Sequence, residues 1–83
     1  MLFDYVYSNI DATLLATSCT FSGFSYIPTG VSPSATFRDG GSGGVIVAKT
    51  SEAAASVYMM PNVLIKTNLY VDVNNAEVVA YIG

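Results

Sequence analysis

Four glycines stand among the seven residues 38–44, and a stretch of this kind can either bind a phosphate or turn the chain. A phosphate-binding loop needs a helix N-terminus after it and usually a Lys-Ser/Thr pair, but the β-branched run at residues 45–48 is typical of a strand. A calcium-binding glycine repeat would need further aspartates at fixed spacing, and Asp39 stands alone. We therefore expect a hairpin connection in which Asp39-Gly40 makes the turn.

The remaining polar residues form no set suited to catalysis. The sequence has no histidine, so a nucleophilic serine could be activated only by Lys49 or Lys66. A carboxylate pair for glycoside hydrolysis would have to come from six acids that follow no pattern: Asp4, Asp11, Asp39, Glu52, Asp72 and Glu77. Asp72 and Glu77 flank Asn74-Asn75, where exposed charge is expected at a turn. We expect solvated acids, no catalytic residues and no enzymatic activity.

Cys19 is the single cysteine, so an internal disulfide is excluded. The absence of histidine removes most metal sites as well. Cys19 lies in an apolar segment, which favours a small core residue over a reactive thiol. We expect neither a metal nor another cofactor, and a free thiol suits synthesis in a reducing cytoplasm.

The charge pattern also excludes several classes of partner. The net charge is −3, and the basic residues Arg38, Lys49 and Lys66 are spread along the chain, which argues against binding of nucleic acid. No apolar run approaches the roughly 18 residues of a membrane span, so we expect no membrane contact. Residues 1–11 lack a basic region and include Asp4, which does not fit a signal peptide.

The length and the low charge together favour assembly with other chains. A chain of 83 residues is expected to form one domain, residues 1–83, that buries only about 60% of its surface and needs further support. Charged residues make up 11% of the chain, against about 25% in an ordinary domain. Protein interfaces are depleted of charge and enriched in tyrosine, of which there are six here. We expect a homo-oligomer, trimer first and dimer second; a neutral Ser/Thr-rich surface is the alternative.

Alternation of apolar and polar residues predicts strands at the C-terminal end. In residues 62–73 the apolar positions recur every second residue and predict a buried face, with core residues Val63, Ile65, Leu69 and Val71. Residues 76–82 alternate in the same way. Asn74-Asn75 lies between the two runs, and asparagine tolerates the positive φ that a type I′ turn requires. We therefore expect residues 62–82 to form a β-hairpin.

Further strands are expected upstream, at residues 2–7, 11–22, 24–27, 35–37, 44–49 and 56–60. The phase of residues 11–22 slips near Leu14-Leu15, which predicts a bulge. Residues 44–49 resemble a strand buried on both faces, Pro61 is expected to end the strand at residues 56–60, and residues 51–56 suit a loop or strand start better than a helical turn. The Pro/Gly-containing residues 28–34 predict a turn.

No helical periodicity appears in the sequence. The expected fold is therefore all-β: a small antiparallel β-sandwich or jelly-roll-like barrel of seven to eight short strands. Residues 1–8 would be an edge strand or a docking arm, with Phe3, Tyr5 and Tyr7 on one face. Tyr58, Met59 and Met60 suit either an adaptable contact patch or the core, and Tyr58 and Met60 complete our set of candidate interface residues.

Four segments in the second half of the chain follow a distinctive order: the turn Asp39-Gly40, the β-branched residues 45–48, the sequence Leu-Tyr-Val-Asp-Val at 69–73, and the Val/Tyr-rich residues 78–81. In this order, residues 35–83 resemble short virion structural proteins of tailed phages. The resemblance implies a small β-sandwich without catalytic residues, located at the capsid surface of a virion after synthesis in the host cytoplasm. It further implies a capsid decoration or cement protein that binds and stabilises the lattice of the major capsid protein.

Two alternative functions stay open at this point. A tail, neck or spike component would use the same type of contact surface in fewer copies per particle. A module that binds host-surface glycans would stack tyrosine rings on sugars, and several tyrosines on one exposed face would favour it.

Overall fold

Residues 4–82, the part of the chain that this computed structural model describes, consist of β-strands and their connections, without a helix. The strands are β1 (Asp4–Ser8), β2 (Ala12–Leu15), β3 (Cys19–Pro28), β4 (Ser34–Asp39), β5 (Val45–Thr50), β6 (Ser56–Ile65), β7 (Leu69–Asn74) and β8 (Ala76–Ile82). All paired neighbours are antiparallel.

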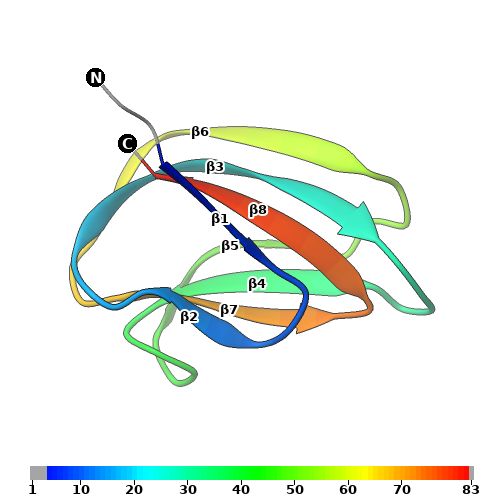
Figure 1. Ribbon diagram of the computed structural model, residues 1–83, viewed down its shortest axis with the longest axis horizontal. Helices are drawn as coiled ribbons and strands as arrows, with labels where there is room; N and C mark the ends of the chain where they lie inside the picture. Colours follow the sequence, from blue (N-terminus) through cyan, green and yellow to red (C-terminus); the bar gives the residue numbers. More distant parts are fainter. Residues whose placement is uncertain (1–3, 83) are drawn as a thin grey trace.

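The strands form two four-stranded sheets, which Figure 1 shows as two stacked layers. Sheet A has the order β1-β8-β3-β6, and sheet B has the order β2-β7-β4-β5. This architecture confirms the predicted all-β class and the β-sandwich, with the strand number at the upper end of the expected range. The two sheets stay separate, so the jelly-roll-like barrel is not the form adopted.

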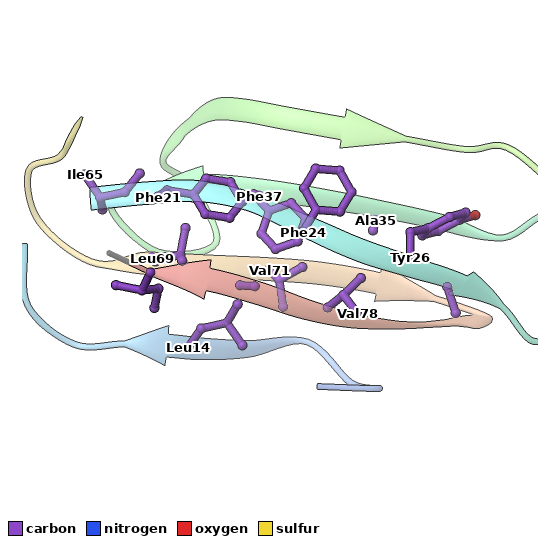
Figure 2. Packing of buried hydrophobic residues seen from close by; sticks show 13 residues of the cluster. Leu14, Phe21, Phe24, Tyr26, Ala35, Phe37, Ile65, Leu69, Val71 and Val78 are labelled. Atoms are coloured by element: carbon purple, nitrogen blue, oxygen red, sulfur yellow. The ribbon is translucent and has the colours of Figure 1, made fainter. Parts of the chain in front are cut away.

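Alternate residues of each sheet point inward and make the core. In β8 the even-numbered residues, from Ala76 to Ile82, are buried, while the odd-numbered ones lie partly exposed. Phe21, Phe24 and Phe37 pack together between the sheets, with ring centroids of Phe24 and Phe37 4.6 Å apart (Figure 2). Tyr26 is fully buried and its hydroxyl donates to the carbonyl oxygen of Glu52 over 2.7 Å, so its polar end is satisfied.

Most connections carry the chain from one sheet to the other; within residues 4–82, only the β4–β5 connection joins neighbouring strands of one sheet. The predicted hairpin over residues 62–82 is therefore wrong, because β7 belongs to sheet B and β8 to sheet A. Asn75 alone of the asparagine pair has a positive φ, 49°. Its side-chain amide donates to the carbonyl oxygen of Val31, and its own carbonyl accepts from the amide of Thr29, so the crossing is fastened to the loop after β3.

The alternating run at residues 62–73 is also divided between the sheets. Residues up to Ile65 belong to β6 in sheet A, and β7 begins at Leu69 in sheet B. The predicted burial of Ile65, Leu69 and Val71 is confirmed, and Val63 packs partly buried against the same core. Within this run, odd-numbered residues point to the core in both β6 and β7, because the two sheets face the same core from opposite sides.

Several upstream boundaries also differ from expectation. The strand expected at residues 11–22 is two strands in different sheets, although the predicted bulge is present in β2 near Leu14. Pro61 does not end β6; the strand lies at the edge of sheet A, where the missing amide donor is tolerated. Residues 51–55 form a loop and residues 29–33 lie outside any strand, as predicted.

The strand at residues 44–49 is not buried on both faces. It is β5, at the edge of sheet B, where the exposed fractions are 74% for Val45 and 46% for Ile46. A β-branched run is equally compatible with a buried central strand and with an exposed edge, since the sequence does not tell which neighbours cover it. At the other end of the chain, β1 is an edge strand of sheet A and pairs with β8 along its length.

Candidate interaction surface

The five candidate interface residues are placed differently by the fold. Tyr5 and Tyr7 of β1 are exposed on the outside of sheet A. Tyr58 of β6 lies on the inner side instead, stacked on Phe24 with ring centroids 4.9 Å apart, and its hydroxyl shares a hydrogen bond with Thr50. Phe3 and the side chain of Met60 lie outside the described part of the structure.

The strand register shows which residues share the outside of sheet A with the two tyrosines. One row runs across the four strands from Tyr5 through Tyr81 and Gly23 to Met59. The next row runs from Tyr7 through Val79 and Ser25 to Val57. A third row pairs Glu77 with Ile27. We call these ten residues the outer A face.

The outer A face is unusually apolar for a surface in contact with water. The exposed fractions are 73% for Tyr5, 74% for Met59 and 64% for Val57. Glu77 is the single charged residue among the ten, and its carboxylate accepts a hydrogen bond from the Tyr7 hydroxyl. That hydrogen bond is the main reason why the pKa of Tyr7 is raised. The face therefore offers aromatic and aliphatic contact area with one hydrogen-bonded carboxylate.

A shallow apolar groove crosses the outer A face over β3. It is lined by Val57 and Met59 on one side, Tyr81 on the other, and Ser22. Gly23 lies between Met59 and Tyr81 in the row, and it has no side chain to fill the space. The Tyr81 hydroxyl hydrogen-bonds Ser25, which fixes the ring beside the groove. An apolar side chain of a partner would fit here between the two walls.

The outside of sheet B has the opposite character. One row runs from Thr13 through Tyr70 and Arg38 to Ile46, and the next includes Asp72, Thr36 and Lys49, so charged and polar residues outnumber the apolar ones. The Arg38 guanidinium Nε lies 2.8 Å from the Asp72 carboxylate, so the two charges form an ion pair. The sandwich thus presents one polar, charged face and one apolar, tyrosine-rich face.

The sequence did not single out Val57, Val79 or Tyr81 as contact residues, and Met59 was expected either in a contact patch or in the core. The sequence did contain an indication of this surface. In residues 56–60 and 76–82, the face that points away from the core carries apolar residues, where a solvent-facing strand would carry polar ones. Pairing across four strands joins those short runs into one surface, and the sequence does not show which strands are neighbours.

The glycine stretch works as predicted. Gly40 and Gly41 have φ values of 107° and 87°, and they connect the antiparallel neighbours β4 and β5. Asp39 is not free to bind a ligand, since its two carboxylate oxygens accept hydrogen bonds from the backbone amides of Lys66 and Thr67. The loop closes the turn between β4 and β5, as expected.

Cys19 is partly buried against the core, in keeping with the predicted structural role. Burial, with a smaller effect of the nearby Asp39 carboxylate, raises the pKa of its thiol. A raised thiol pKa keeps the side chain protonated and unreactive at neutral pH.

Two features are absent from residues 4–82. No three His, Cys, Asp or Glu residues gather as metal ligands there, and no helix in that range could span a membrane. Comparisons of the chain with protein-family models, curated proteins and solved structures found no match.

Proposed function

We propose that this chain is a structural protein that acts by binding other protein chains, with the outer A face buried in the assembly. The observation that carries the proposal is the composition of this face, in which one carboxylate stands among tyrosines, valines and Met59. Apolar and aromatic residues with few charges are typical of the centre of a protein interface. Left in water, a continuous apolar patch of this kind would favour aggregation.

The sequence resemblance gives the proposal its specific form. The chain would be a virion protein of a tailed phage, a capsid decoration or cement protein that stabilises the lattice of the major capsid protein from the capsid surface. A tail, neck or spike component is the alternative within the same class, and copy number per virion distinguishes hundreds of decoration proteins from a few tail parts.

The direct test is co-sedimentation with capsid shells. Purified protein is mixed with undecorated shells of the major capsid protein from the same virus, at low and at high salt, and the shells are pelleted. We expect the protein in the pellet under both conditions, because an apolar interface depends little on screening of charges. Protein that stays in the supernatant at both salt concentrations contradicts the proposal.

A matched pair of variants tests the surface itself. Val57→Lys places a charge on the outer A face, whereas Val45→Lys makes the same change at an edge-strand position of sheet B that is at least as exposed. We expect Val57→Lys to reduce pelleting and Val45→Lys to leave it unchanged. The reverse result would move the contact surface to sheet B.

Glycan binding is a second candidate, favoured by one observation: Tyr5, Tyr7 and Tyr81 lie on one exposed face. Such rings could stack on sugar rings. The groove beside Tyr81, however, offers Ser22 as its polar group, and recognition of a sugar needs several fixed donors and acceptors. Binding of the protein to immobilised host glycans, abolished by Tyr5→Ala and Tyr81→Ala, would favour this function over the structural one.

A further inference from the structure

We propose that the chain covering the outer A face is a second copy of this protein, packed face to face about a two-fold axis. The inference rests on the proposed function in that it takes this face to be an interface. The axis would lie between the two molecules, parallel to the strands and midway between β8 and β3. The pair would then form a dimeric unit in which the outer A face of each copy is buried against the other.

The residue rows make the face complementary to itself under this operation. A two-fold axis along the strands reverses the strand order but keeps each row in place, so that β1 faces β6 of the second copy and β8 faces β3. In the first row Tyr81 then faces Gly23, and Tyr5 faces Met59. Large side chains thus meet small ones, and the two most exposed residues of the row, Tyr5 and Met59, cover each other.

The second row repeats the same match. Val79 faces Ser25 of the second copy, and Tyr7 faces Val57. In both rows the larger residue stands on β8 and the smaller on β3, so interdigitation occurs on both sides of the axis. Aligned sheets pack face to face in this manner, with strands within about 30° of each other.

The charges are compatible with self-association. Glu77 lies in the last row and faces Ile27 of the second copy, so the two Glu77 carboxylates do not lie opposite each other, and each keeps the hydrogen bond from the Tyr7 hydroxyl. An almost uncharged face binds an uncharged surface better than a charged one. The reason is that an unpaired charge buried against such a face loses its hydration. The outer A face itself is such a surface.

A dimer would have to use a large share of so small a molecule, whose extents between Cα atoms are 34 × 28 × 17 Å. Each partner contributes about 600–1,000 Å² to a specific interface, so the contact would extend from the outer A face over the rest of the outside of sheet A. Most of the face would have to be used, which the complementary rows allow.

Sedimentation equilibrium of the purified protein tests the proposal. We expect a mass twice the 8.7 kDa of the chain. Tyr5→Glu and Met59→Lys, each alone, should yield the monomer mass at a concentration at which the unaltered protein remains dimeric. In the double variant, the new carboxylate of each copy faces the new ammonium group of the other copy, which gives two such pairs per dimer. Dimerisation should therefore be stronger than in either single variant. Val45→Lys should stay dimeric, and circular dichroism checks that every variant is folded.

The outcomes separate this inference from the proposed function. A monomer or a trimer at all concentrations overturns the face-to-face dimer, and so does a double variant that is no more dimeric than the single ones. If a monomeric protein still pellets with capsid shells and Val57→Lys abolishes pelleting, the proposed function stands and the second copy is the wrong occupant. A dimer that responds as expected but never binds shells supports this inference and contradicts the capsid role.

Discussion

At the scale of single residues, Asp39 shows how one side chain serves two parts of the fold. It precedes the glycine turn between β4 and β5, and its carboxylate also accepts the backbone amides of Lys66 and Thr67, each over 2.9 Å. Those amides belong to the corner where the chain passes from sheet A to sheet B. The hydrogen bonds from Lys66 and Thr67 lower the pKa of Asp39 below its ordinary value of 3.8.

This hydrogen bonding predicts a contribution of Asp39 to the pH dependence of stability. Because the pKa is lower in the folded state, the contribution is fully present above about pH 4, and it is lost as the pH falls through the lowered folded-state pKa. Asp39→Asn should therefore lower the melting temperature at pH 7 and flatten its decline towards acid pH. Thermal melts between pH 7 and pH 2 measure both effects.

The control is Glu52→Gln, which removes one carboxylate at an exposed loop position. If Glu52→Gln flattens the decline of the melting temperature towards acid pH as much as Asp39→Asn does, the change in net charge explains the effect, and the hydrogen bonds of Asp39 do not.

At the scale of elements, the irregularity between β3 and β6 depends on a glycine. The register of both neighbours of β3 shifts between Phe21 and Gly23. Gly23 has a φ of +148°, and a Cβ atom there would overlap the carbonyl oxygen of Tyr58 on the neighbouring strand. The two backbones approach closely at this point, which also leaves the groove of the outer A face open.

Gly23→Ala should therefore destabilise the sandwich by about 1–3 kcal/mol, the range for strained backbone positions. Gly43→Ala is the matched control, because a Cβ at Gly43 meets no atom within 4 Å. Urea unfolding followed by fluorescence of the tyrosines measures both variants. Equal stability of the two would mean that β3 and β6 can separate enough to hold a methyl group.

At the scale of the whole molecule, the sandwich is asymmetric across its two faces. Ion-paired and polar residues gather outside sheet B, and tyrosines and aliphatic residues gather outside sheet A. The low overall charge of the sequence is therefore not spread evenly. Under the proposed function, contacts with other proteins lie on the apolar side of the molecule.

The whole molecule should also be indifferent to small ligands that need histidine, clustered acids or clustered bases. Thermal melts in the presence of EDTA, calcium, ATP or oligonucleotides should superimpose within error. The reason is the composition, with no histidine and three dispersed basic residues. A rise of several degrees with calcium would show that the acids or the glycine turn bind it after all.

Local patterns in the sequence determined the class of fold and much of the core. Period-two alternation placed Ile65, Leu69 and Val71 inside, the phase slip located the bulge near Leu14, and Asp39-Gly40 marked the one connection between sheet neighbours. These features depend on a few consecutive residues. The exposed positions of Tyr5 and Tyr7, two of the proposed contact residues, agree with the alternation of β1.

Only the tertiary structure decided which strands are neighbours, and most of the candidate surface follows from that. Residues 62–82 read as one hairpin because an asparagine at positive φ suits a hairpin turn, and here Asn75 adopts that conformation in a turn between the two sheets. Tyr58 turned inward while Val57 and Met59 turned outward, and Tyr81 became the neighbour of Gly23 across strands that are distant in sequence. Strand pairing is a long-range choice set by the summed burial of both sheets, so no short stretch of residues encodes it.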